Sequence, residues 1–132
     1  MRTILFSMLW TILILMAVAG CKPEPPLSQP EEDLKTSIDV PSYATTPAAT
    51  LSFNVKLESA MPPAGLRIEY SVKSEIDNQS YTQGPGINSM STVVPVTISN
   101  LPRQKICICT IIITSNTKPT NTSTQSFRVV YK

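Results

Sequence analysis

Apolar and polar side chains alternate along several short stretches of this chain, and this period of two constrains the fold more than any other feature. The alternation runs through residues 51–57, 66–73, 94–99 and 127–132. Successive side chains of a strand point to opposite faces, so each stretch predicts a half-buried strand. Residues 106–114 are apolar at most positions, as expected of a central strand. A weak first strand is expected at 37–40, and no stretch after residue 21 keeps a helical period.

Turn-forming residues separate these stretches. They gather at residues 61–65, 84–86, 101–102 and 115–123. Six or seven short strands in about 100 residues predict an all-β sandwich, and a domain of this size buries enough apolar surface to fold alone. The long polar connection after the second alternating stretch is expected to contain a further short strand near Gln79–Gln83.

Residues Thr36–Lys132 resemble a fibronectin type III or immunoglobulin-like domain. The most specific piece is Val93–Asn116, in which Asn100-Leu101-Pro102 forms a corner between two strands. The resemblance implies a β-sandwich of six or seven strands. Pro95 has no N–H to donate, so its strand belongs at a sheet edge or a bulge. That strand is an edge in the fibronectin-like arrangement, which Pro95 therefore favours.

The first 21 residues have the layout of a secretory signal. Arg2 precedes an uncharged run of 16 residues, Ile4–Ala19, and small residues follow. Val18-Ala19-Gly20-Cys21 resembles the lipobox of bacterial lipoproteins, which implies cleavage before Cys21 and acylation of its thiol, with palmitate among the chains. Two or more acyl chains hold a protein stably at a bilayer. The run is shorter than the roughly 20 residues that span a membrane, but an uncleaved helix in the inner membrane stays open as the alternative.

The residues after the lipobox predict a spacer. In Gram-negative lipoproteins an Asp after the acylated Cys favours retention in the inner membrane, so Lys22 implies sorting to the outer membrane, on either face. Four prolines between residues 22 and 31 favour extended conformations that form no core. We therefore expect a signal peptide at 1–20, an acylated cysteine and Pro-rich tether at 21–35, and the sandwich at 36–132.

Composition excludes several function classes. The chain has no histidine, which removes the usual general base and the commonest metal ligand. Lys and Arg number 11 against 9 Asp and Glu, too even a balance for a nucleic-acid footprint. The sequence therefore predicts a protein that is not an enzyme, with no metal, no cofactor and no nucleic-acid partner.

Cys107 and Cys109 lie two residues apart in the expected central strand. Both would point to the same side, toward the core, because Thr110 and Thr114 mark the opposite face as the wetter one. Their Cα atoms would lie roughly 6.5 Å apart, near the upper limit for a disulfide. Two buried, reduced thiols are the favoured interpretation. A redox-active or intermolecular thiol is the alternative.

Four residues are candidates for contact with a ligand or partner. Asn78 and Tyr81 lie in the long loop of residues 74–91, and Lys118 and Asn121 lie in the loop expected at Thr114–Ser123. Long loops in compact domains are often functional, although a floppy connection explains the first loop equally well. The even-numbered Ile106, Ile108 and Ile112 are expected on the outer face of the central strand. There they form an apolar patch, unless a neighbouring strand and the long loop cover them.

These features predict a membrane-anchored module of the cell envelope that acts by protein contact or by strand pairing along an exposed sheet edge. Its partners would be the lipid bilayer, through acylated Cys21, and a protein of the envelope. Carbohydrate or small-ligand binding through the loops is the alternative, which the lack of Trp after the signal segment disfavours. In this fold the N-terminus shares a pole with the Thr114–Ser123 loop. We therefore expect a partner approaching from outside to meet the Ser74–Gln83 side first.

Overall fold

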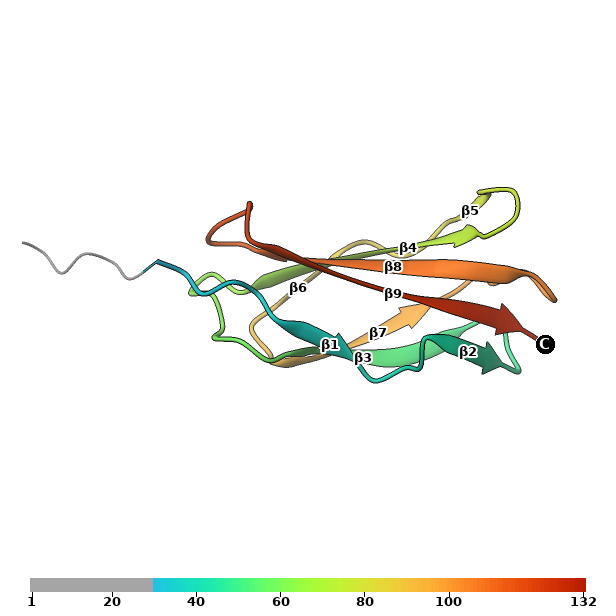
Figure 1. Cartoon of the computed structure of the whole chain (residues 1–132), viewed down its shortest axis with the longest axis horizontal. Helices are drawn as coiled ribbons and strands as arrows, with labels where there is room; N and C mark the ends of the chain where they lie inside the picture. The colour runs from blue at the N-terminus through green and yellow to red at the C-terminus, as the bar shows by residue number, and fades with distance from the viewer. Residues whose placement is uncertain (1–29) are drawn as a thin grey trace, which may run out of the picture. The chain divides into compact units, whose positions relative to one another are not determined.

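The computed structural model describes residues 30–132, which form nine strands in two sheets (Figure 1). The strands are β1 (Thr36–Ile38), β2 (Tyr43–Thr46), β3 (Leu51–Leu57), β4 (Leu66–Ser74), β5 (Ser80–Tyr81), β6 (Ile87–Ser89), β7 (Val93–Ile98), β8 (Ile106–Ser115) and β9 (Thr122–Tyr131). One sheet has the order β1-β3-β7, and the other runs β2-β9-β8-β4-β5 with β6 also paired to β4. The domain is an all-β sandwich, as the sequence predicts. The predicted signal segment, Cys21 and the predicted tether up to residue 29 lie outside the described residues.

The strands beyond the six or seven expected arise where the chain changes partners. Just before Pro41, β1 runs antiparallel to β3. Just after it, β2 runs parallel to β9. The connection that follows β4 supplies both β5, where a short strand is expected, and β6, and each of these pairs antiparallel with β4. Residues 30–132 contain no helix long and apolar enough to cross a membrane.

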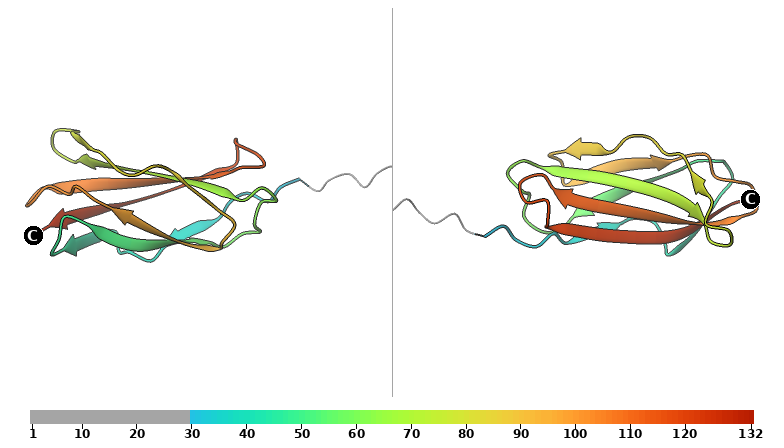
Figure 2. Two further views of the ribbon diagram at one scale, coloured as in Figure 1. Left: turned by 180° about the vertical axis from the view of Figure 1, so that it is seen from behind. Right: turned by 90° about the horizontal axis from the view of Figure 1, so that it is seen from above.

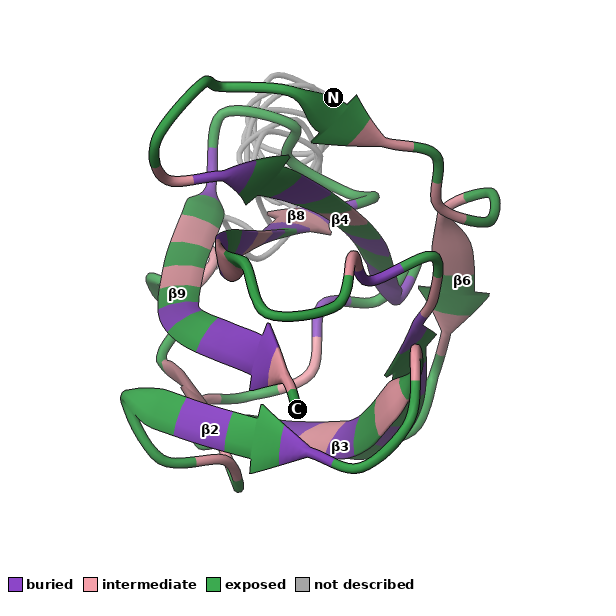
Figure 3. Cartoon of the chain, turned by 90° about the vertical axis from the view of Figure 1, so that its right-hand side faces the viewer, coloured by how far each residue is buried: buried purple, intermediate pink, exposed green. Residues whose placement is uncertain are grey.

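The core lies between the two sheets and is built from the inward-facing residues of the alternating strands. Figure 3 shows bands of buried and exposed residues alternating along the strands. Phe53 of β3 and Phe127 of β9 meet edge to face, with ring centroids 5.1 Å apart. The side chains below 2% exposure include Leu66, Ile68, Val72, Val96, Ile98, Ile111, Ile113 and Val129. Each such aliphatic side chain contributes about 1.5–3 kcal/mol by its burial.

Pro95 lies in β7, the edge strand of the three-stranded sheet, which confirms the place predicted for it. The backbone hydrogen bond from Leu57 to Thr92 sets the ladder between β3 and β7. Hydrogen-bonded pairs recur every second residue from there, so Pro95, opposite Asn54, turns its nitrogen toward the open edge. The missing N–H therefore costs the sheet no hydrogen bond.

Asp39 fixes the chain where it leaves β1 and crosses toward the other sheet. Its carboxylate accepts hydrogen bonds from the backbone N–H and the side-chain Nδ2 of Asn54, both at 2.7 Å. Its own N–H donates to the Asn54 carbonyl at 3.2 Å. These hydrogen bonds from Asn54, the backbone one first, lower the pKa of Asp39 below its ordinary value.

Replacing Asp39 with Asn should reduce stability at neutral pH and leave it unchanged in acid. A carboxylate whose pKa is lower in the folded state stabilises the fold at neutral pH, and this contribution is lost as the pH falls through the folded pKa. The melting temperatures of Asp39→Asn and the wild-type chain should therefore differ near pH 7 and converge toward about pH 2. Glu58→Gln is the control, because the Glu58 side chain makes no hydrogen bond or ion pair within residues 30–132. A constant difference across this range would contradict the assignment.

Candidate functional site

The outer face of the six-stranded sheet carries the apolar patch expected from the even-numbered residues of β8. Ile108 and Ile112 are 37% and 40% exposed, and Ile106 is half-buried. The neighbouring strands β4 and β9 lie beside β8 and do not cover it, as the view from above in Figure 2 shows. Ile108 and Ile112 are therefore open among the described residues, whereas the ion pair between Glu75 and Arg128 crosses β8 beside Ile106.

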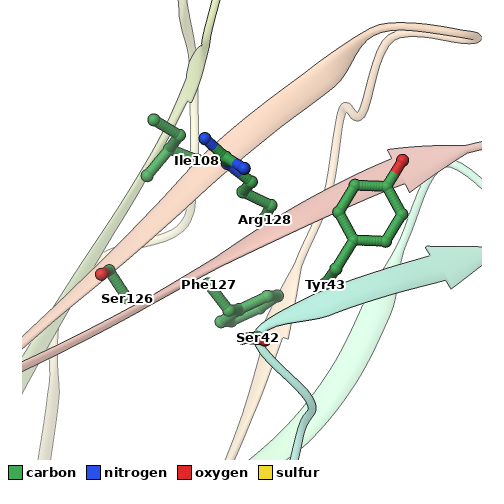
Figure 4. Close-up of a pocket in the computed structure, with 6 residues that line it drawn as sticks. All are labelled: Ser42, Tyr43, Ile108, Ser126, Phe127 and Arg128. Atoms are coloured by element: carbon green, nitrogen blue, oxygen red, sulfur yellow. The ribbon is translucent and has the colours of Figure 1, made fainter.

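A shallow depression lies on this face where β2, β9 and β8 meet (Figure 4). It is lined by Ser42, Tyr43, Ile108, Ser126, Phe127 and Arg128. The Tyr43 side chain is exposed, and Arg128 forms an ion pair with Glu75 at 2.5 Å. Within residues 30–132 no cluster of three or more His, Cys, Asp or Glu side chains gathers that could hold a metal ion. The residues that line this depression are suited to packing against another surface by shape and by polar contacts.

The turn between β4 and β5, residues 75–79, presents the most exposed large apolar side chain of the domain. Ile76 is 85% exposed. Asp77 beside it accepts a hydrogen bond from the Gln79 N–H at 3.1 Å, and this bond is the main cause of its lowered pKa. Lys105 reaches the same carboxylate at 3.5 Å. The turn is thus attached to the rest of the domain through Lys105, while the Ile76 side chain is exposed to solvent. The mostly polar sequence of this loop gave no signal of an exposed apolar residue.

Two of the four predicted contact residues lie at or next to this turn. Asn78 is exposed and adopts a left-handed backbone conformation with φ 55°. Tyr81 of β5 is half-buried, with its ring packed against the core, and its hydroxyl donates to Gln79 at 3.4 Å. Asn78 is therefore placed for contact, whereas Tyr81 offers only part of its surface.

The other two lie in the β8–β9 loop, residues 116–121, which is shorter than the loop expected at Thr114–Ser123. Lys118 is exposed there. Asn121 is 7% exposed and turns into the domain. All its polar side-chain atoms form hydrogen bonds within the domain, whereas the sequence predicts a contact residue at this position.

Asn121 binds the segment where the chain enters the sandwich. Its Oδ1 accepts from the Leu34 N–H at 3.0 Å, and its Nδ2 donates to Glu31 Oε1 at 2.7 Å and to the Glu32 carbonyl at 2.9 Å. Glu32 in turn accepts from the Ala60 N–H at 3.0 Å. We call these contacts the Asn121 clasp. Residues 31–35, expected to belong to the tether, are thereby part of the folded domain, and Leu34 joins its core.

The clasp and the β4–β5 turn lie at opposite ends of the sandwich (Figure 1). At one end the Asn116 N–H donates to Gly65 beside the clasp. At the other the Glu75 N–H donates to Ile106. This arrangement confirms that the β8–β9 loop shares a pole with the N-terminal segment of the domain. The candidate residues therefore divide between two ends and do not form one site.

The free edge of β7 is closed to a further strand at nearly every position. The Ser91 hydroxyl donates to the Val93 carbonyl at 2.8 Å and accepts from its N–H at 3.3 Å. Pro95 has no N–H, and the side-chain amide of Gln83 bonds both backbone groups of Ser99 at 2.8 Å. Along this edge the Pro95 carbonyl and the backbone groups of Thr97 point outward unblocked.

One edge of the six-stranded sheet is β2, which is only 4 residues long. Ser42 and Thr46 accept backbone hydrogen bonds from β9, so residues of odd number face outward. Pro41 and Pro47 occupy that parity and flank the strand. These features are typical of edges protected against strand addition. Of the two contact modes expected from the sequence, the geometry favours side-chain contact over strand pairing.

Cys107 and Cys109 are both fully buried and free, with side chains turned into the core as predicted. Burial raises the pKa of the Cys109 thiol to about 12 and also raises that of Cys107. A thiol held protonated and shielded from solvent is a poor nucleophile. Neither group therefore contributes a reactive site to the native domain.

No protein-family model matches the chain, and no curated protein sequence matches it. Among solved structures it is similar to the solution NMR structure of residues 27–141 of a conjugate transposon protein from Bacteroides vulgatus. The two chains are 12% identical, and the match covers 84% of this chain and 94% of the other, with a TM-score of 0.49.

Replacing Asn121 with Ala should destabilise the domain by about 1–3 kcal/mol, because it leaves buried backbone and carboxylate groups unpaired. Amide exchange at Leu34 should accelerate first, since its N–H loses its acceptor. Hydrogen exchange with mass spectrometry measures both effects. Lys118→Ala, in the same loop, is the matched control. An Asn121→Ala chain with wild-type exchange over residues 31–35 would refute the clasp.

Cys107 and Cys109 should resist maleimide in the native chain and react once it is unfolded. Labelling requires local opening, so we expect both to react at least about 100-fold more slowly than an exposed reference thiol introduced by Thr120→Cys in the β8–β9 loop. Peptide mapping by mass spectrometry separates these sites from Cys21. Fast native labelling of either thiol would contradict the burial.

Proposed function

We propose that this chain is a lipid-anchored, non-enzymatic interaction module of a bacterial cell envelope. The observation that carries the proposal is the Asn121 clasp, which fixes the N-terminal segment at the pole opposite the β4–β5 turn. If the domain is anchored through that segment, the β4–β5 turn is at the end farthest from the membrane.

The anchor in this proposal is acylated Cys21, on the strength of the lipobox Val18-Ala19-Gly20-Cys21. Between Cys21 and the first residue of the clasp lies Lys22–Pro30, rich in proline. At about 3.1 Å per residue an extended proline-rich segment of this length reaches about 28 Å. Lys22 favours the outer membrane as the location.

The contact surface in this proposal is the β4–β5 turn. Ile76 supplies apolar area that is already exposed in the free domain, and Asp77 beside it accepts a hydrogen bond from Gln79 across the turn and pairs with Lys105. Little conformational entropy is then lost on binding, which favours affinity. An apolar side chain among polar neighbours suits a protein partner.

The anchor is tested by Cys21→Ser in a Gram-negative host. We expect the wild-type chain to incorporate labelled palmitate and to fractionate with membranes, because two or more acyl chains hold it there. Cys21→Ser should lose the label and accumulate as an uncleaved precursor. A Cys21→Ser chain that matures and partitions like the wild type would overturn the proposal.

The contact surface is tested by Ile76→Asp, with crosslinking of the membrane-bound chain to envelope proteins as the readout. The substitution should reduce the crosslinked partner about tenfold or more, in the range of an interface hot spot, without altering the melting temperature, because Ile76 is exposed. Lys118→Glu, at the clasp end, is the control and should change capture less than about twofold. The reverse pattern would contradict the orientation.

A further inference from the structure

The outward-facing residues of β4 and its extension carry charges in an order that reverses about its centre. From one end to the other they are Arg67, Glu69, Ser71, Lys73 and Glu75. The signs are positive, negative, neutral, positive and negative. Arg67 and Glu69 bond each other at 2.9 Å, and Glu75 reaches β9 across the same face, so all belong to one surface. If a second copy of this strand ran in the opposite direction, centred on Ser71, each charge of one copy would face a charge of opposite sign on the other.

The two exposed isoleucines of β8, Ile108 and Ile112, follow the same symmetry. Lys73 is registered with Ile108, and Glu69 is registered with Ile112. Thr110 lies midway between the two isoleucines. Reversing the residue order along the strands about Thr110 therefore exchanges Ile108 with Ile112. The same reversal exchanges Lys73 with Glu69.

The row through the centre of the face holds only small side chains. Ser71, Thr110 and Ser126 are registered with one another across β4, β8 and β9. A shallow depression occupies part of this row, lined by Glu69, Tyr70, Ser71, Thr110 and Ile112. Small residues in a central row let two such faces approach closely.

We propose that the outer face of the six-stranded sheet is an interface between two copies of this chain, packed face to face with their strands antiparallel. The two-fold axis lies in the interface, across the strands at Thr110. Lys73 of each copy then faces Glu69 of the other. Ile108 of each copy likewise faces Ile112 of the other, and the contact is isologous.

The charges also favour an antiparallel over a parallel arrangement of the strands of the two copies. In a parallel arrangement β4 of one copy would lie over β9 of the other at the same height. Lys73 and Arg128 share one row of the sheet, through Ile108, so like charges would meet. In the antiparallel arrangement they do not. Lys73 makes no ion pair within residues 30–132, and the second copy supplies its counter-charge.

The size of the face predicts a reversible dimer. β4, β8 and β9 are 9 or 10 residues long, and with their shorter neighbours they make a surface of roughly 20 Å by 30 Å, or about 600 Å². Counted over both copies this is about 1,200 Å², at the lower end of the range for specific interfaces. Covalent trapping of the dimer is therefore the appropriate measurement.

The first test places a thiol on the two-fold axis. The full chain with Thr110→Cys is treated with a short bis-maleimide, because packed sheets lie roughly 10 Å apart. We expect covalent dimer well above the wild-type chain, which shares its other cysteines. Thr114→Cys is the matched control. It lies on the same strand with similar exposure, yet its two copies would be about 27 Å apart. Equal yields from the two variants would overturn the proposal.

The second test exchanges the facing charges in the Thr110→Cys chain. Lys73→Glu alone or Glu69→Lys alone sets like charges against each other at two symmetric positions, which should lower the dimer yield about tenfold. The double variant restores opposite charges and should recover the yield to within about twofold. Circular dichroism confirms that each variant is folded. A double variant as poor as the singles, or Thr110→Cys captured by a different protein without homodimer, would overturn the proposal.

The dimer does not require the lipid anchor, since the same crosslinking works on membrane-bound and on detergent-extracted chain. Loss of palmitate labelling would leave this result standing, and absence of the dimer would leave the anchor and the Ile76 contact standing. The two proposals therefore fail separately.

Discussion

The packing of β8 between β4 and β9 is the interaction on which the rest of the domain depends. β8 is paired with both neighbours along nearly its whole length. Its odd-numbered residues from Cys107 to Ile113 are fully buried, and its even-numbered residues form the centre of the outer face. Because one strand supplies both surfaces, a register shift of a single residue would exchange core and exterior. The residues that face the core therefore fix which residues lie on the outer face.

A sandwich leaves sheet edges that invite strand pairing, and in this one the edges are short or blocked. Ser91, Pro95 and Gln83 close most of β7, and two prolines bound β2. Chain-to-chain contact is thereby shifted from backbone groups to side chains. Such contact depends on shape and charge order, and the outer face of β4 and β8 supplies both.

In the proposed lipid-anchored protein, the Asn121 clasp sets which end of the domain points away from the anchor. It joins residues about 90 positions apart and uses every polar atom of one side-chain amide. A domain tethered from that end exposes Ile76 at the other. An antiparallel dimer would place the two tether exits at opposite ends of the pair and each turn beside the other copy's clasp, so the proposed orientation, with Ile76 farthest from the anchor, is that of a single copy.

The sequence alone determined the features that depend only on residues adjacent along the chain. The period of two located the main strands and the buried side of Cys107 and Cys109, and the missing N–H of Pro95 located an edge. The lipobox at Cys21 stays a prediction from sequence, outside the described residues. Only the tertiary structure decided that Asn121 turns inward, that residues 31–35 belong to the fold, and that Ile76 stands free. It also decided, through the register of β4 against β8, that Lys73 lies beside Ile108. The physical reason is that the direction of a loop side chain depends on partners distant along the chain, whereas the alternation of a strand is set by its own backbone geometry.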